Sequence, residues 1–233
     1  IPVQIEGIHQ KCYFQLDTGA PTSMIYGKPL ASLLKLGLSL DKIYLDSVEY
    51  LSGIEMTLGG SRLKAQNLSI YPDYGKSIEP EDSLKEIKLG TIGADFFQHH
   101  ITELDFVNQR IVFYTEREAW MTKQAPFVPF RFQGRRFMLP CELNGKVREM
   151  FYDSGSSAFG LITTKNQYDK MADPDAKEIQ YGANSWGDSF PIHHKASSQM
   201  MQMNGLNIPL KRVSYVDMYS FLPPLIGPFA RIG

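Results

Sequence analysis

One tripeptide pattern occurs twice in the chain, each time directly after an apolar segment. Asp17-Thr18-Gly19 follows Phe14–Leu16, and Asp153-Ser154-Gly155 follows Met150–Tyr152. A single copy indicates little, because a chain of this length contains one by chance about one time in ten. Two copies at the ends of two apolar strands present two carboxylates on tight turns. In each turn the glycine permits a backbone conformation that a Cβ would obstruct, and the hydroxyl can hydrogen-bond its own backbone to fix the loop.

The regions downstream of the two tripeptides also correspond, which indicates an internal repeat. The aspartates are 136 positions apart (153 − 17), and Thr91-Ile92-Gly93 corresponds to Leu225-Ile226-Gly227 with an offset of 134 (227 − 93). Glycine turns at Gly60 and Gly205 lie between these landmarks in each half, 145 positions apart (205 − 60). Three landmarks in the same order predict two lobes that each bring one carboxylate to a shared site.

These paired motifs resemble those of the pepsin-like and retropepsin-like aspartic proteases. The resemblance covers most of residues 1–115 and, more loosely, residues 127–233. It implies a mainly antiparallel all-β fold with few short helices, arranged as two lobes with a pseudo-twofold repeat. We therefore expect an N-terminal lobe over residues 1–118 and a C-terminal lobe over residues 119–233.

The two predicted lobes differ at their ends. Thr102–Phe113 resembles the hairpin that closes such a lobe, with a turn after an Asp-Phe pair. The second half has no matching segment, because Gly233 lies only six residues beyond Gly227. Either the sequence given is cut, or the second lobe is a degenerate copy, and the residues leave both open.

Local patterns predict short strands and three helices. Strands are expected where apolar residues alternate or cluster between turn residues, and helices where Pro, Thr and Gly mark the ends. We expect strands over residues 3–7, 12–16, 43–50, 54–58, 63–71, 101–105, 110–114, 127–132, 136–143 and 147–152, and helices over 28–36, 94–99 and 164–171. Residues 71–88 are expected to form a surface excursion, and 116–126 the interlobe connection.

The resemblance assigns the chemistry to Asp17 and Asp153. Two carboxyl groups this close cannot both ionise, so they share one proton, as is known for the aspartic-protease pair. The ionised member takes a proton from a trapped water, which attacks a peptide carbonyl, and the protonated member stabilises the developing oxyanion. Supporting roles fall to the loop residues Thr18, Gly19, Ser154, Gly155 and Ser156. The mechanism needs no metal, and no cofactor is expected.

One departure from the pepsin pattern bears on pH. A hydroxyl residue usually follows the glycine and donates to the carboxylate; the second copy has Ser156, but the first has Ala20, as retroviral proteases do. A missing donor to the charged form raises a carboxyl pKa. We therefore predict an optimum that is mildly acidic and less acidic than that of pepsin.

Lobes of this kind usually extend a hairpin over the cleft. In the first half the candidate is Ile43–Ile54, with Tyr44 or Tyr50 toward the substrate, and in the second it is Asn184–Asp188, which contains Trp186. The substrate is a polypeptide that would bind extended, as an added strand between hairpin and floor. An aromatic residue in such a segment is more often packed within its own sheet.

Composition excludes several other classes. A formal charge of −1 gives no basic field for nucleic acid, and no apolar run approaches the ~20 residues of a membrane span. The histidine pairs at 99–100 and 193–194 are predicted to lie at the surface, since adjacent strand residues point to opposite faces. Cys12 and Cys141 are predicted to be buried thiols. A secreted or periplasmic location is favoured, although the sequence does not fix it.

Alternatives remain beside the protease interpretation. Each aspartate could simply cap its turn, which we would favour for one copy but not for two. The chain could instead be a binding module, catalytically weak or inactive, that holds a peptide or inhibitor in its cleft; the abbreviated second lobe keeps this open. A single-lobe protease that must dimerise is unnecessary, because one chain supplies both aspartates, and we expect a monomer.

Overall fold

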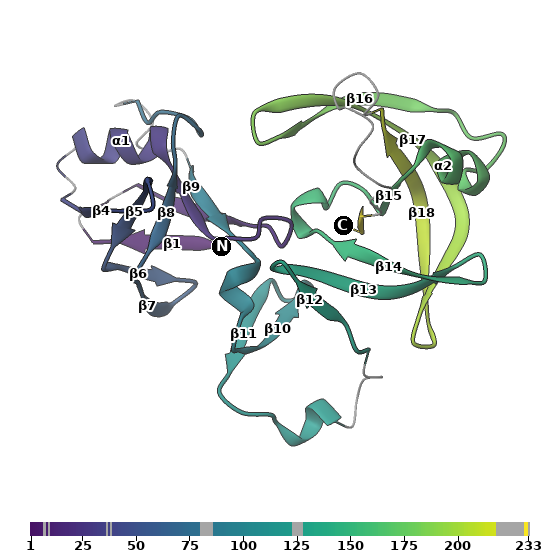
Figure 1. Cartoon of the computed structure of the whole chain (residues 1–233), viewed down its shortest axis with the longest axis horizontal. Coiled ribbons are helices and arrows are strands. Elements are labelled where there is room, and N and C mark those ends of the chain that lie inside the picture. Colours follow the sequence, from purple (N-terminus) through teal and green to yellow (C-terminus); the bar gives the residue numbers. More distant parts are fainter. Residues whose placement is uncertain are drawn as a thin grey trace.

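The described residues fold mainly into β-strands, which confirms the all-β prediction. The computed structural model describes residues 1–6, 8, 10–35, 37, 39–79, 86–122, 128–217 and 231–232. Within them lie a nine-stranded sheet, an eight-stranded sheet and a separate two-stranded sheet. Figure 1 shows the two large sheets as curled bodies on either side of the molecule, with the two-stranded sheet below their junction.

The nine-stranded sheet, called here the first sheet, is built from residues 2–92. Its strand order is β4-β5-β8-β3-β9-β2-β1-β6-β7. The strands are β1 (Pro2–Ile5), β2 (Cys12–Leu16), β3 (Met24–Tyr26), β4 (Asp41–Leu45), β5 (Val48–Ser52), β6 (Ile54–Leu58), β7 (Ser61–Ala65), β8 (Leu68–Tyr71) and β9 (Ile87–Ile92). Helix α1 (Gly27–Lys35) contacts β3 and β9.

Alternation of apolar and polar residues explains how this sheet forms its core. Along β6, Ile54, Met56 and Leu58 are buried, whereas Glu55 between them is exposed, as expected for a strand with one face inward. The helix α1 buries Leu30 and its neighbours against the same core. The cluster also contains the fully buried side chains Phe14, Ile25, Leu33, Leu51 and Leu89.

The eight-stranded sheet, called here the second sheet, has its own core. Its order is β12-β13-β14-β19-β15-β18-β17-β16. The strands are β12 (Arg131–Gln133), β13 (Arg136–Leu143), β14 (Lys146–Tyr152), β15 (Leu161–Thr163), β16 (Ile179–Ser185), β17 (Asp188–Met203), β18 (Leu206–Val216) and β19 (Arg231–Ile232). The core includes Cys141, Met150, Leu161, Met201 and Val213. Helix α2 (Lys165–Met171) packs on β18 and is capped by Thr164, whose Oγ1 accepts from the Gln167 amide.

The strands around the two aspartates pair in the same way in both sheets. β9 lies between β2 and β3, parallel to the first and antiparallel to the second. β19 likewise lies between β14 and β15, parallel to the first and antiparallel to the second. The strand β3 then pairs in parallel with β8, and β15 with β18. The element order of strand, aspartate turn, strand and helix is therefore common to both halves.

This pairing changes one landmark of the predicted repeat. Thr91 and Ile92 pair with the strand that carries Asp17, and the residues that pair in this way with the Asp153 strand are Arg231 and Ile232. The offset is 140 (232 − 92). The segment Leu225-Ile226-Gly227, predicted for this place, lies outside the described residues. The counterpart of β9 is thus six residues later than predicted (232 − 226).

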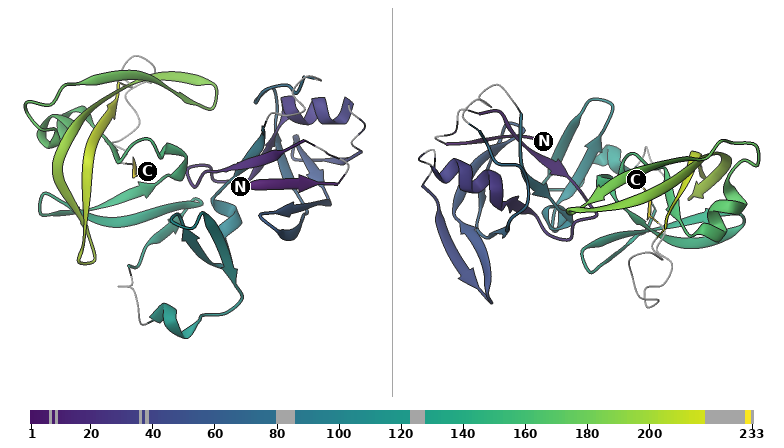
Figure 2. Two further views of the ribbon diagram at one scale, coloured as in Figure 1. Left: turned by 180° about the vertical axis from the view of Figure 1, so that it is seen from behind. Right: turned by 90° about the horizontal axis from the view of Figure 1, so that it is seen from above.

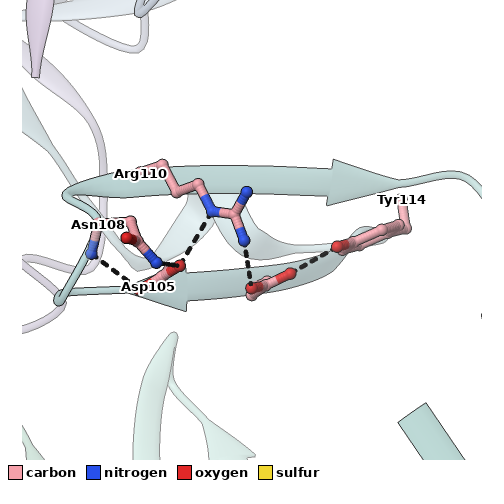
Figure 3. A network of polar contacts seen from close by, with 5 residues as sticks. Asp105, Asn108, Arg110 and Tyr114 are labelled. Atoms are coloured by element: carbon pink, nitrogen blue, oxygen red, sulfur yellow. Dashed lines mark hydrogen bonds and ion pairs between the residues drawn. The ribbon is translucent and has the colours of Figure 1, made fainter. Parts of the chain in front are cut away.

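The two-stranded sheet is the predicted hairpin, with the predicted bounds. β10 (Ile101–Asp105) pairs with β11 (Arg110–Tyr114). Its turn is held by Asp105, which accepts from the Asn108 backbone amide at 3.0 Å, the Asn108 side chain at 2.7 Å and Arg110 Nε at 2.9 Å (Figure 3). A turn with this many local donors explains why the sequence alone located it.

Several of the predicted strands have different bounds in the structure. The strand expected over residues 43–50 is a hairpin, because Asp46 and Ser47 adopt φ of 48° and 66° and reverse the chain. The strand expected over 63–71 divides into β7 and β8. The strand expected over 127–132 is the short β12, and residue 127 lies outside the described residues. The helix expected over 94–99 is a short 3-10 turn, η2 (Ala94–Phe97).

Two further features concern side chains and membrane spans. Cys12 and Cys141 are both buried and unpaired, as predicted, and burial raises each thiol pKa to about 11. Among the described residues, no helix combines the length and the apolar character that a membrane crossing requires.

Candidate active site

Asp17 lies where the first sheet approaches the second. It directly follows β2, and its backbone amide donates to Ile92 of β9 at 3.0 Å. Its side chain is only 8% exposed and accepts from the Gly19 amide at 2.9 Å. A buried carboxylate at the end of a strand is therefore held by its own turn.

Asp153 occupies the equivalent place after β14 and is 5% exposed. One carboxylate oxygen accepts from the amides of Gly155 at 3.0 Å and Ser156 at 3.2 Å. The other accepts from the Ser156 hydroxyl at 2.9 Å. The aspartate thereby caps a short 3-10 turn, η4 (Ser154–Ser156), which is the role that the alternative interpretation gave it. Its carboxylate also lies beside Gly19 of the other half of the molecule.

The hydroxyl residues after the two aspartates connect the two loops reciprocally. The Thr18 amide donates to Ser154 Oγ at 3.0 Å, and the Ser154 amide donates to Thr18 Oγ1 at 3.0 Å. Each hydroxyl also donates across the junction to a strand carbonyl, Thr18 to Tyr152 at 3.1 Å and Ser154 to Leu16 at 3.2 Å. Four hydrogen bonds between residues more than 130 positions apart fix the loops against each other. We call these four bonds the loop brace.

The two glycines provide space for the opposite carboxylate. A Cβ on Gly19 would lie 2.4 Å from Asp153 Oδ1, and a Cβ on Gly155 would lie 2.4 Å from Asp17 Oδ1. Neither glycine has positive φ. Their role is thus close approach and not an unusual backbone conformation, which corrects the prediction that they permit the turns.

The site raises the pKa of Asp17 to about 6. Burial is the main cause, and the negative charge of Asp153 adds to it, together with a hydrogen bond between the two carboxyl groups. The amides of Gly19 and Ala20 oppose the shift because they stabilise the ionised form. The two carboxyl groups are thus close enough for the charge of Asp153 to act on Asp17.

A polar group that the sequence did not reveal supports the Asp17 loop. Asp95 Oδ1 accepts from the Ser23 amide at 2.8 Å and from its hydroxyl at 2.7 Å. The Ser23 hydroxyl in turn accepts from the Gly93 amide at 3.0 Å. Behind it, the hydroxyls of Tyr26 and Thr91 are hydrogen-bonded at 2.6 Å in the buried interior. In the sequence, the only indication of these hydrogen bonds is that Asp95 stands two residues after Gly93.

The predicted substrate residues lie on two hairpins, one from each of the large sheets. Tyr44 and Tyr50 lie on the β4–β5 hairpin at one edge of the first sheet, and in Figure 1 this edge is the one remote from the second sheet. Tyr44 is 72% exposed, and its hydroxyl donates to Glu49 at 2.9 Å. The contact of either tyrosine with a substrate stays a prediction. Trp186 lies at the tip of the β16–β17 hairpin and reaches the other half of the molecule.

No set of three metal-binding side chains gathers within the described part of the chain. His193 Nδ1 faces Glu178 at 2.9 Å. His194 is buried and its Nδ1 is hydrogen-bonded to the Tyr181 hydroxyl at 2.9 Å, so the prediction of a surface position is wrong for this residue. Burial lowers the pKa of His194, and the neighbouring Arg212 charge lowers it further.

No protein-family model matches the chain, and no curated protein matches it.

Proposed function

We propose that the protein is an aspartic-type endopeptidase in which Asp17 and Asp153 activate a water for the hydrolysis of peptide bonds. The observation that carries this proposal is the meeting of two buried carboxyl groups from separate sheets, held by the loop brace. Asp17 has a raised pKa and lies in contact with a specific charged partner, which is the arrangement expected for a catalytic group. The all-β architecture with the same strand pairing around each aspartate agrees with a two-lobed acid-protease fold, with lobes at residues 1–118 and 119–233.

The hydrogen bonds indicate where the shared proton resides. The Asp17 carboxylate accepts from the Gly19 amide, and the Asp153 carboxylate accepts from the amides of Gly155 and Ser156. Asp153 has the Ser156 hydroxyl in addition, at 2.9 Å, where the first loop has the methyl group of Ala20. An extra donor stabilises the ionised form. Asp153 is therefore the base, and Asp17 holds the proton.

The reaction then proceeds without a covalent intermediate. Asp153 removes a proton from a water between the carboxyl groups while the water oxygen bonds to the peptide carbon, and Asp17 gives its proton to the carbonyl oxygen. The resulting diol breaks its C–N bond as Asp153 passes its proton to the leaving nitrogen. One diol hydroxyl returns a proton to Asp17 as the new carboxyl group forms. The buried pair is thereby restored.

The pH optimum follows from the pair. Activity requires one proton on the two carboxyl groups, so it falls when the second proton is lost, near the raised pKa of Asp17 of about 6. A mildly acidic optimum agrees with the sequence prediction.

Substitution of each aspartate tests the proposal. Asp17→Asn and Asp153→Asn should each lower kcat/KM for a quenched-fluorescence peptide library by about 10²–10⁴-fold, because each removes an acid–base group. Asp175→Asn is the matched control, since Asp175 is an exposed carboxylate outside the site. Pepstatin, which mimics the tetrahedral intermediate, should inhibit the wild-type protein. Cleavage that persists in either site variant would refute the proposal, and pepstatin binding without any cleavage would favour a binding module.

A further inference from the structure

The turn of Asp153 is supported by the second sheet through Phe159. The Phe159 amide donates to the Ser156 carbonyl at 2.9 Å, and the Ser156 hydroxyl donates to the Asp153 carboxylate. The Phe159 side chain is only 8% exposed. Directly after it, a Cβ on Gly160 would lie 2.8 Å from the Leu210 carbonyl oxygen of β18. The chain therefore leaves the turn in close contact with strands of the second sheet.

The strands at this place are β16, β17 and β18, which pair side by side. Figure 2 shows the long, curved strands of this part of the second sheet in green. The ring of Tyr181 on β16 stacks on that of Phe159, with centroids 5.8 Å apart and planes at 19°. The Tyr181 hydroxyl is hydrogen-bonded to Nδ1 of His194 on β17 at 2.9 Å. Side-chain contacts thus connect the Asp153 turn to a histidine of β17.

His194 lies where a neutral imidazole is favoured. It is 8% exposed, and its cross-strand neighbours are Ile179 of β16 and Ser214 of β18, which carry no charge. Arg212 stands two residues from Ser214 along β18 and therefore on the same face. Burial lowers the pKa of His194, and the Arg212 charge lowers it further. Among the described residues, the titratable group in contact with the imidazole is Tyr181.

The preceding histidine has different surroundings. His193 points to the other face of the sheet, where its Nδ1 faces Glu178 at 2.9 Å and its ring stacks on Tyr215 at a centroid distance of 4.6 Å. The charge of Lys195 also acts on Glu178. A proton added to His193 lies beside a carboxylate, whereas one added to His194 is repelled by a guanidinium. His193 is therefore a matched control for His194.

We propose that His194 is a pH-sensitive positioning residue of the Asp153 turn, which its neutral imidazole supports through Tyr181 and Phe159 and which its protonation loosens. A protonated imidazole carries hydrogen on both nitrogens, so Nδ1 can then only donate to the Tyr181 hydroxyl. The cation is also buried and is repelled by Arg212. Both changes weaken the packing of Tyr181 and thereby that of the Phe159 ring stacked on it.

The sign of the pH effect follows from the lowered pKa of His194. Below the ordinary histidine pKa of 6.5, the folded protein binds fewer protons at this residue than the unfolded chain does. The unfolding free energy contributed by His194 therefore falls as the pH decreases from about 6.5. Asp17 acts in the opposite direction, since its raised pKa makes the unfolding free energy fall as the pH rises. Substitution of one residue at a time separates the two contributions.

The first experiment measures the turn by amide hydrogen exchange at about pH 7.5 and about pH 5. His194→Asn keeps an acceptor near the place of Nδ1 but carries no titrating group. The protection of the Phe159 amide in the wild type, divided by that in His194→Asn, should fall by about 2- to 10-fold between the two pH values. The same ratio formed with His193→Asn should not fall. A constant ratio with both His194→Asn and the second variant His194→Gln would overturn the proposal.

The second experiment tests whether His194 acts through Tyr181. Tyr181→Phe keeps the ring that stacks on Phe159 and removes the hydroxyl that is hydrogen-bonded to His194. In this background, His194→Asn should no longer change the pH dependence of Phe159 protection. If the change is as large as in the wild-type background, His194 affects stability as a whole and not the Asp153 turn, and its role as a positioning residue is overturned.

Catalysis gives a further readout, which rests on the proposed function. A loosened Asp153 turn lowers kcat, so the ratio of kcat at about pH 5 to kcat at about pH 6.5 should be about 2- to 10-fold higher in His194→Asn than in the wild type. His193→Asn should match the wild type. An equal ratio in His194→Asn would overturn the catalytic part of the proposal. If no protein cleaves at either pH, the proposed function fails, and hydrogen exchange still decides whether His194 supports the turn.

Discussion

The loops of Asp17 and Asp153 occupy equivalent positions in the two sheets but differ in one hydroxyl group, which only the Asp153 loop has after its glycine. Both aspartates follow a strand, both lie beside the other's glycine, and both loops contribute equally to the loop brace. The difference is that Ser156 donates to Asp153, whereas Ala20 stands at the matching place. The shared features fix where the carboxyl groups lie, and in the proposed mechanism the single difference decides which of them carries the charge. The proposal therefore assigns position and protonation to different residues.

The largest effect on stability should come from removing a hydroxyl of the loop brace, which the two loops share. Thr18→Val leaves the Ser154 amide and the Tyr152 carbonyl without their partner, and Ser154→Ala does the same to the Thr18 amide and the Leu16 carbonyl. Each variant should lower the free energy of unfolding by about 2–4 kcal/mol, because two buried groups lose their hydrogen bonds. Denaturant unfolding checks this. Strongly unequal losses would show that the two sides of the brace are not equivalent.

The next largest effect is the dependence of the unfolding free energy on pH, which the raised pKa of Asp17 causes. The pKa of Asp17 is raised from 3.8 to about 6, so the folded state holds more protons than the unfolded state between these values. The unfolding free energy therefore falls as pH rises through this window. Asp17→Asn should remove this cost and stabilise the protein by roughly 2–3 kcal/mol above about pH 6, with no gain below about pH 4.

Thermal unfolding across pH 3.5 to 7.5, as a series of about five buffers, measures this difference. Asp153→Asn should give no such gain, because it removes an acceptor from three donors. A gain that does not depend on pH would contradict the assignment of the proton to Asp17.

The smallest effect should come from moving the hydroxyl itself. Ser156→Ala removes a donor from the ionised carboxylate and should shift the acidic limb of the pH–rate profile upward. Ala20→Ser supplies a donor to Asp17 and should shift the basic limb downward. Each shift should be about 0.5–1 pH unit, the size of one hydrogen bond. If Ser156→Ala moves the basic limb instead, the roles of the two aspartates are reversed.

The sequence was most informative where the structure depends on neighbouring residues. The Asp17 and Asp153 turns, the Thr164 cap and the hairpin from residue 101 to 114 are held by donors within a few positions. Short-range patterns of this kind identify a turn directly. The candidate site itself was found because the same local pattern occurred twice.

It was least informative where distant segments decide the outcome. Arg231–Ile232 shows no strong strand pattern, and its place between β14 and β15 follows from pairing across the sheet. Ser23 and Asp95 are 72 positions apart, and nothing near either residue indicates their hydrogen bonds. The position of the Tyr44 hairpin at one edge of the first sheet likewise follows from the order in which distant strands pair. The contact of Trp186 with Tyr71 depends on both sheets at once.

The position of β19 has a consequence for the order of folding. Phe151 of β14 pairs with Arg231 of β19, and the two residues are 80 positions apart (231 − 151). β19 can therefore take its place beside β14 only after this length of chain has been synthesised. Pairings between such distant segments form slowly. We therefore expect the strands around Asp153 to complete their pairing late, after those around Asp17 have paired. Under the proposed function, the carboxyl pair would reach its catalytic geometry only late in folding.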